Sequence, residues 1–240
     1  MKSEPLEAAT RWHFVNAVEQ LVEAALIRVH TAANEALRLR GAFHLVLAGG
    51  TTPRVLYARM SELDTDWGNW HIWFGDERCL PINHPERNSR MAQDTWLGGS
   101  AIPAAQIHPI PAELGASAAA AAYASRLHEV GEFDLVLLGL GEDGHTASLF
   151  PGHDWGTCPD SPDALAVQDA PKPPSERVSL SAHRLSHTRA LLFLVSGAGK
   201  CDAVAAWRRH EPIPAASIRP VAGVDVLAER ICIQKNGEDA

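Results

Sequence analysis

Four short apolar segments, each followed at once by a glycine-rich or charged stretch, constrain the fold of this chain most strongly. They read FHLVLA (43–48), HIWFG (71–75), FDLVLLGL (133–140) and ALLFLV (190–195). Each is too short and too uniformly apolar for a surface helix, and this pattern indicates a strand that is covered on both faces. Strands of this kind are typical of a parallel sheet.

Helical patterns alternate with these segments. Residues 10–39 have apolar side chains at three- and four-residue spacings and stop at Gly41, which predicts one long amphipathic helix. Further helices are expected between the apolar segments, over residues 53–60, 87–97, 116–130 and 200–209. Strand and helix in alternation predict the α/β class, with a mostly parallel sheet and helices on both faces. Residues 151–174, rich in proline, glycine and aspartate, predict a long loop around one short strand at 164–167.

Composition limits the classes of protein to which this chain can belong. Its 240 residues, 46% of them hydrophobic and 21% charged, predict a single domain over residues 1–240. A net charge of −8 disfavours nucleic acid, whose phosphates attract basic proteins. The opening residues MKSEPLEAATRWHF lack the apolar core of a signal peptide, and no apolar run approaches the ~18 residues of a membrane span. We therefore expect a cytoplasmic protein that does not bind a membrane.

The four cysteines are far apart in the sequence and form no C-x-x-C pair: Cys79, Cys158, Cys201 and Cys232. They suggest neither a disulfide framework nor a zinc site. We expect reduced thiols, mostly buried.

Chemically reactive residues gather directly after each predicted strand. The four strands lead into GGTTP (49–53), DER (76–78), GEDGH (141–145) and SGAGK (196–200). The carboxyl ends of parallel strands meet at one edge of a sheet, and ligands bind there where the strand order reverses. The sequence therefore predicts one pocket built from four separate stretches.

Two of these stretches have the properties of phosphate sites. In GGTTP, Gly49 and Gly50 let the backbone approach a ligand, Thr51 and Thr52 add hydroxyl groups, and the free N–H groups of a helix start favour an anion. A tight strand-to-helix turn with a threonine cap is the structural alternative. In SGAGK, Lys200 could meet the phosphate as a point charge, or it could be a solvated lysine at a helix start.

Two further side chains are candidates for catalysis or binding. Arg78 could clamp a phosphate or carboxylate with two hydrogen bonds, or it could pair with Asp76 or Glu77. His145 lies in a glycine-rich turn two residues after Asp143 and before an expected helix start. Histidine titrates near neutral pH, so His145 is the strongest candidate for a general base.

These motifs resemble those of the 6-phosphogluconolactonases. LAGGTTP, FGDERCLPINHPERNSRMA and DLVLLGLGEDGHTASLFPG are similar to three motifs of that family, and with SGAGK they cover about residues 43 to 207. The wider group includes glucosamine-6-phosphate deaminase and, more distantly, ribose-5-phosphate isomerase. Thr51 stands where the commoner form of the first motif, GGSTP, has a serine. Residues 88–90 read NSR, where many relatives have SNY or a similar triplet.

The resemblance implies a Rossmann-like fold, 6-phospho-D-glucono-1,5-lactone as substrate, and no metal or organic cofactor. In the mechanism that we expect, GGTTP, Arg78 and Lys200 hold the phosphate and His145 activates water. Asp143 or Asp76 orients His145, and the sequence does not choose between them. The oxyanion donors are expected in the glycine loop at 139–144, which includes Gly144, with Arg78 as the second choice. A small sugar phosphate lactone is the expected partner, and the protein is expected to be a monomer or weak homodimer.

Two rival functions are considered. A glucosamine-6-phosphate deaminase would continue differently after the DGH triplet, and TASLFP at 146–151 favours the lactonase. A non-catalytic sugar-phosphate sensor would need a DNA-reading module, and the first 40 residues do not show a basic helix-turn-helix pattern.

Overall fold

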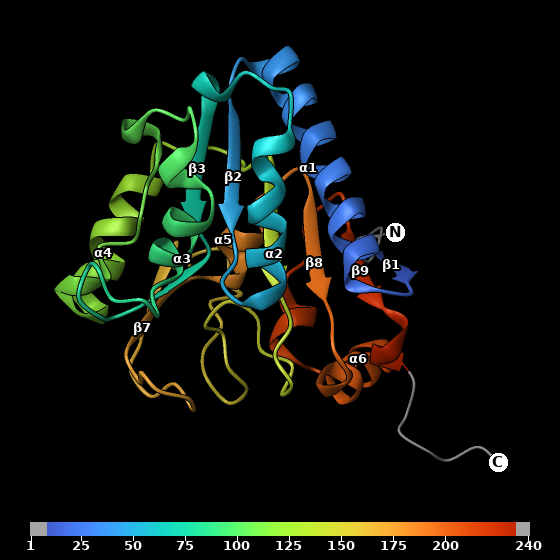
Figure 1. The fold of residues 1–240 in the computed structure, drawn as a ribbon. Coiled ribbons are helices and arrows are strands. Elements are labelled where there is room, and N and C mark those ends of the chain that lie inside the picture. The colour runs from blue at the N-terminus through green and yellow to red at the C-terminus, as the bar shows by residue number, and fades with distance from the viewer. Residues whose placement is uncertain (1–8, 234–240) are drawn as a thin grey trace, which may run out of the picture.

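A computed structural model describes residues 9–233 and shows a six-stranded parallel sheet flanked by helices (Figure 1). The strands are β1 (Thr10–Val15), β2 (Phe43–Leu47), β3 (Trp70–Phe74), β4 (Asp76–Arg78), β5 (Leu135–Gly139), β6 (Ala164–Val167), β7 (Arg177–Leu180), β8 (Leu191–Val195) and β9 (Val224–Glu229). The α-helices are α1 (Val18–Arg40), α2 (Thr51–Arg59), α3 (Asn88–Thr95), α4 (Ala116–Leu127), α5 (Ala182–Ser186) and α6 (Cys201–Arg208).

The central sheet has the order β1-β9-β8-β5-β2-β3, and all neighbouring strands run parallel. Its register places Leu45 of β2 opposite Ile72 of β3 on one side and Leu135 of β5 on the other. These side chains are buried, as expected for strands that are covered on both faces. The predicted α/β class and the four predicted strands are confirmed.

A second, smaller sheet joins β4, β7 and β6 in antiparallel pairs. The short strand predicted at 164–167 is confirmed as β6. DER at 76–78, expected only as a strand-end loop, forms β4 and pairs with β7. Buried residues of this sheet, among them Val178 and Leu180, belong to the same hydrophobic cluster as the central sheet.

The prediction of one helix over residues 10–39 is wrong at its start. Residues Thr10–Val15 form the edge strand β1, which pairs with β9, and the helix α1 begins at Val18. The side chains of Arg11 and His13 both bond to Asp225 of β9, so polar contacts across the pair fix an edge strand that lacks a uniformly apolar sequence. The strand β9, which includes Asp225, was not predicted.

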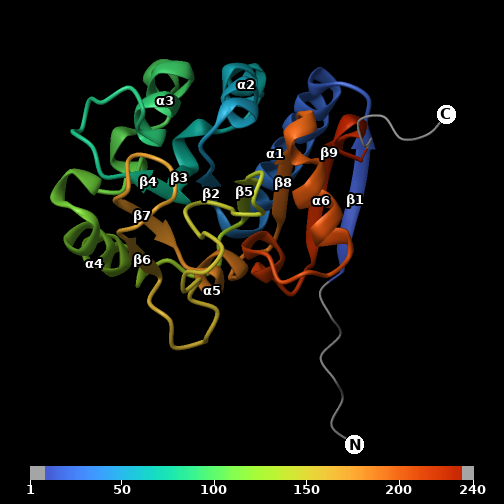
Figure 2. The same ribbon diagram turned by 90° about the horizontal axis from the view of Figure 1, so that it is seen from below.

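The helix α1 ends where the sequence indicates. Gly41 adopts a left-handed φ of 75°, and its N–H donates to the carbonyl of Leu37. A residue without a Cβ is favoured at such a position. The helices expected at 53–60, 87–97, 116–130 and 200–209 correspond to α2, α3, α4 and α6. Figure 2 shows α1, α2 and α3 on one side of the central sheet, with α5 and the small sheet on the other.

The strand order reverses between β2 and β5. From β2 the chain adds β3 on one side and later returns to place β5 on the other. The carboxyl ends of the strands point down in Figure 1, and the loops that follow β2 and β5 leave the sheet there. This is the position at which the sequence predicts a ligand site.

No helix in the described part of the chain combines the length and hydrophobicity that crossing a membrane requires. Residues 1–8, on which part of the signal-peptide prediction depends, lie outside the described residues. The single domain over residues 1–240 stays a prediction.

Candidate active site

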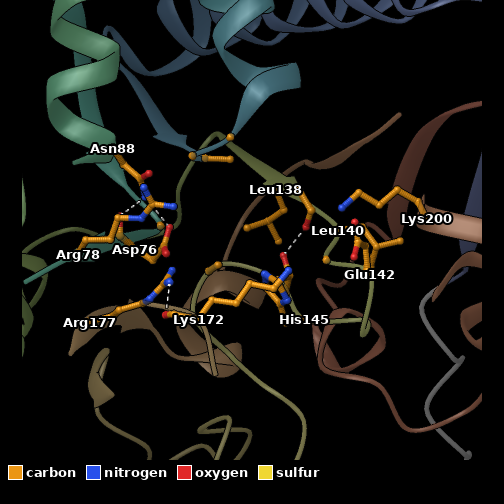
Figure 3. A pocket seen from close by; sticks show the side chains of 18 residues that line it. Asp76, Arg78, Asn88, Leu138, Leu140, Glu142, His145, Lys172, Arg177 and Lys200 are labelled. Carbon is orange, nitrogen blue, oxygen red and sulfur yellow. Dashed lines mark hydrogen bonds between the residues drawn. The ribbon is translucent and has the colours of Figure 1, made fainter. Parts of the chain in front are cut away.

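A cavity of about 210 Å³ opens at the carboxyl ends of β2, β3 and β5 (Figure 3). Six residues predicted from the sequence line it: Gly49, Gly50, Asp76, Arg78, His145 and Lys200. The structure thus brings together residues from all four predicted stretches. The remaining predicted residues, Thr51, Thr52, Asp143 and Gly144, belong to the same loops but are not among the residues that line the cavity.

The N-terminus of α2 lies between Arg78 and Lys200. On the Arg78 side, Gly49 packs so closely on Asn88 that a Cβ at Gly49 would overlap the amide side chain. On the Lys200 side, the hydroxyl of Thr52 is 2.8 Å from that of Ser196. The first N–H groups of a helix have no partner within the helix, so they are available to an anion in this position.

His145 is held in a tight loop by Asp143. Its Nδ1 lies 2.5 Å from Oδ1 of Asp143, and its backbone N–H donates to the same oxygen at 3.2 Å. Burial raises the pKa of the Asp143 carboxyl, but the hydrogen bond and the charge of His145 lower it more, so the net pKa lies below its usual value. The carboxylate is therefore ionised at neutral pH and accepts the Nδ1 proton, which leaves Nε2 available for proton transfer.

Glycine is required beside the imidazole. A Cβ at Gly141 would overlap the ring of His145. The loop closes on itself at this point, because the N–H of Gly141 donates to the carbonyl of His145 at 2.7 Å. The imidazole also contacts Phe150, whose ring centroid lies 4.8 Å away.

The helix expected after His145 does not form. Residues 146–150 make a turn in which the N–H of Leu149 donates to the carbonyl of Thr146, and Ala147 has a positive φ of 48°. Ser148 uses its hydroxyl to donate to Asp76 at 2.6 Å. These tertiary contacts override the local helical pattern of the sequence.

Asp76 contacts a different set of partners from Asp143. It is only 6% exposed, and it accepts hydrogen bonds from Ser148 and from Nδ2 of Asn88 at 2.9 Å. In the described structure Asp143, not Asp76, is the carboxylate that bonds to His145.

Arg78 lines the cavity, and one of its donor groups has no partner among the described residues. Its Nη1 donates to the carbonyl of Glu86 at 2.7 Å, whereas its buried Nε has no partner among the described residues. Ion pairs with Asp76 or Glu77, the structural alternative for this residue, do not occur in the described part of the chain. A buried donor without a partner is unfavourable unless a ligand or water satisfies it.

The N–H groups of the glycine loop are less available than the sequence suggests. Gly141 donates to His145 as described, and Gly144 donates to the carbonyl of Gly141 at 3.1 Å. Both groups are therefore already paired, and cationic side chains become the better oxyanion donors.

Metal ligands do not gather in the described residues, where no group of three or more His, Cys, Asp or Glu side chains could hold an ion. The described cysteines form no disulfide. The prediction that they are mostly buried is wrong: Cys232 is buried, Cys79 and Cys201 are partly exposed, and Cys158 is exposed.

The family model of glucosamine-6-phosphate isomerases/6-phosphogluconolactonase matches residues 16–227. The chain belongs to this family. A 6-phosphogluconolactonase of Synechocystis is 37% identical over 193 residues, which are 77% of this chain and 79% of that protein. The chloroplastic 6-phosphogluconolactonase 3 of Arabidopsis thaliana is 37% identical over 196 residues, 74% of this chain but only 60% of the Arabidopsis protein.

A solved structure agrees with the family assignment. The crystal structure of the Thermotoga maritima 6-phosphogluconolactonase superimposes with a TM-score of 0.85 at 25% identity, over 92% of this chain and 100% of that one. The Rossmann-like fold implied by the resemblance is thereby confirmed.

In this member of the glucosamine-6-phosphate isomerase/6-phosphogluconolactonase family, two cations of the cavity were not assigned by the sequence analysis: Lys172 and Arg177. Arg177 is 7% exposed, and its guanidinium donates to the carbonyls of Pro174 and Lys172. Burial lowers the pKa of Arg177, with the nearby Asp76 acting in the opposite direction. Lys172 comes from the segment 151–174 that was predicted as a loop, whereas Arg177 is the first residue of β7, outside that segment.

Proposed function

We propose that this protein hydrolyses 6-phospho-D-glucono-1,5-lactone to 6-phospho-D-gluconate, the lactonase step of the pentose phosphate pathway. Family membership supports this proposal, as do the relatives named 6-phosphogluconolactonase. The observation that carries it is the contact of His145 with Asp143 at a cavity lined by Arg78, Lys172, Arg177 and Lys200. The pair supplies a proton acceptor, and the cations supply the charge that a phosphate needs.

The phosphate is placed at the N-terminus of α2. There Gly49 and Gly50 leave room for an anion, and the helix dipole favours it. Arg78 and Lys200 approach this position from opposite sides (Figure 3), so two cations face the two negative charges of the phosphate. Binding energy from the phosphate then positions the distant lactone carbonyl.

His145 acts as the general base. With its Nδ1 proton donated to Asp143, Nε2 removes a proton from water as the water oxygen attacks the C1 carbonyl of the lactone. The ionised Asp143 stabilises the imidazolium that forms. Asp143 is thus a positioning residue for His145, whereas Asp76 orders the wall of the cavity through Ser148 and Asn88.

The tetrahedral oxyanion is stabilised by side-chain cations. Lys172 and Arg177 both line the cavity, and neither is assigned to the phosphate. Preorganised donors of this kind typically contribute ~3–4 kcal/mol to transition-state stabilisation. The imidazolium of His145 then returns its proton to the departing ring oxygen, and the C1–O bond breaks to leave the open-chain acid.

One assay tests this proposal against both rivals. Acid release from freshly prepared 6-phosphogluconolactone should exceed the spontaneous rate. Because the family also includes glucosamine-6-phosphate isomerases, ammonia release from glucosamine 6-phosphate is measured in parallel. Ammonia release without lactone hydrolysis would establish the deaminase, and lactone binding without turnover would establish the sensor.

The monomeric or weakly dimeric state and the cytoplasmic location remain predictions. The relative in Arabidopsis is described as chloroplastic, so relatives occur in more than one compartment.

A further inference from the structure

A second cavity, of about 710 Å³, lies between β1, α6 and residues 210–219. No residue lines both cavities. Its volume falls within the range of ~300–1,000 Å³ typical of small-molecule sites. The mechanism proposed above makes no use of it.

Tryptophan side chains form much of its wall. Trp12 of β1 and Trp207 of α6 meet edge to face with ring centroids 5.4 Å apart, and Trp207 is fixed from behind by Phe193 at 4.7 Å. Trp155 lines the same cavity, and its indole N–H donates to the carbonyl of Phe150 at 2.7 Å. Trp12 and Trp155 are partly exposed and provide surfaces on which an aromatic ligand can stack, whereas Trp207 is only 5% exposed and supports Trp12.

The exposed polar groups around the cavity favour an anion. Arg208 and Arg219 line it, and neither forms an ion pair with a carboxylate in the described part of the chain. Arg208 lies over the ring of Phe14 at 5.8 Å, and Nε of Arg219 donates to a backbone carbonyl. The one carboxylate of the lining, Glu211, is already paired with Arg209 at 2.8 Å.

Two walls of this cavity touch the residues on either side of His145. Ile213 packs on Gly144, where an added Cβ would lie only 2.9 Å from the Cβ of Ile213. The carbonyl of Gly144 also accepts the N–H of Ala215 at 3.1 Å. A ligand that moves Ile213 would therefore shift the backbone next to the imidazole.

The second connection runs through Trp155. Its indole is bonded to the carbonyl of Phe150, and the ring of Phe150 contacts that of His145. The loop of His145 is thus held from both ends by residues that also form the second cavity.

We propose that the second cavity binds a nucleotide, with the base stacked on the tryptophans and the phosphates paired with Arg208 and Arg219, and that binding changes the activity of His145. The binding step is independent of the proposed lactonase function, whereas the effect on turnover rests on it.

Binding is tested by titrating the full chain with ATP and following tryptophan fluorescence, since three of the seven tryptophans line the cavity. Adenosine and tripolyphosphate, which each supply half of the ligand, should bind at least tenfold more weakly than ATP. The double variant Arg208→Ala/Arg219→Ala should lose at least tenfold in affinity. The matched control is Arg38→Ala, because Arg38 is an exposed arginine of α1 that does not line the cavity. Three results would each overturn the proposal: an unchanged ATP affinity in the double variant, an equal loss of affinity in the control variant, or tripolyphosphate binding as tight as that of ATP.

The basic first cavity could also attract the phosphates of ATP, so its contribution is measured separately. Lys200→Ala should leave the ATP affinity within about twofold of the wild type. If Lys200→Ala loses ATP affinity and Arg208→Ala/Arg219→Ala does not, the ligand lies in the first cavity and the proposal is refuted. In lactone hydrolysis, saturating ATP should change kcat at least twofold in the wild type and not in the double variant. If ATP binds at the second cavity and kcat is unchanged, the coupling to His145 is refuted. If no lactone hydrolysis occurs either with or without ATP, the proposed function fails while the binding result stands.

Discussion

Acidification should destabilise the fold through a stack of histidines on β2 and β3. The rings of His44 and His71 lie parallel with centroids 4.6 Å apart, and His108 stacks on Trp73 at 3.9 Å. Burial, reinforced by the neighbouring histidines, lowers the pKa of His44 and of His108 to about 4, and burial also lowers the pKa of His71. Asp134 opposes the shift at His44, whereas nearby arginines add to it at both sites.

Whether acid stabilises or destabilises the protein depends on which state, folded or unfolded, binds protons at the higher pH. In the unfolded chain these histidines titrate near 6.5, whereas in the folded protein His44 and His108 stay neutral down to about pH 4. Between these values the unfolded state binds more protons, so stability falls as the pH falls through this window. Protonation of His44 also removes the acceptor for the indole N–H of Trp73, which is 3.2 Å from Nδ1.

The magnitude can be worked from these shifts. At pH 5.0, about 1.5 units below the ordinary value, each histidine would cost ~2 kcal/mol at ~1.4 kcal/mol per unit, or ~4 kcal/mol for His44 and His108 together. Both side chains are partly exposed, and solvent screening reduces the effect by about half. We expect a loss of about 2 kcal/mol in the free energy of unfolding between pH 7.5 and pH 5.0.

Denaturant unfolding at the two pH values measures this loss. The wild type is compared with His44→Gln/His108→Gln, in which the glutamine at position 44 can still accept from Trp73. Because packing changes act at both pH values, only the difference between the two conditions is used. The exposed His128→Gln variant should behave as the wild type. An equal loss in the wild type and the double variant would refute the reasoning.

Three further predictions concern the candidate active site. His145→Ala should lower kcat for the lactone by at least ~100-fold without loss of thermal stability. As a control, the variant His153→Ala, which changes an exposed neighbour, should keep wild-type turnover. An active His145→Ala enzyme would exclude His145 as the general base. Lys200→Ala and Arg78→Ala should each raise KM more than they lower kcat, and a wild-type KM in both would contradict the phosphate assignment. Gly141→Ala should displace the imidazole and lower kcat by about tenfold or more while the protein stays folded, as circular dichroism can check, and full activity would show that the loop accommodates the methyl group.

The inner strands could be predicted from the sequence because they are buried on both faces. The strands β2, β3, β5 and β8 are almost wholly apolar over five residues each. The edge pair β1 and β9 escaped prediction because Arg11 and Asp225 interact across it, and this contact joins residues 214 positions apart. Local periodicity does not report such a contact.

The sequence predicted those residues of the candidate site that lie directly after parallel strands. Reasoning from strand ends placed Arg78, His145 and Lys200 at one cavity. Lys172 enters it from the loop between β6 and β7, and Arg177 from the start of β7, for which no rule of strand order applies. The partner of His145 also needed coordinates, because the conformation of the loop decides whether Asp143 reaches Nδ1.

The place of β9 in the central sheet has a consequence for folding during synthesis. It lies between β8 and β1, so the first strand of the chain meets the sheet only through the last. A nascent chain that ends before residue 224 therefore has no docking partner for residues 10–15, although the other four strands of the central sheet, β2, β3, β5 and β8, can already pack. Closing so long a loop is slow, and the tryptophan-lined cavity next to β1 is completed only after Val224 has been synthesised.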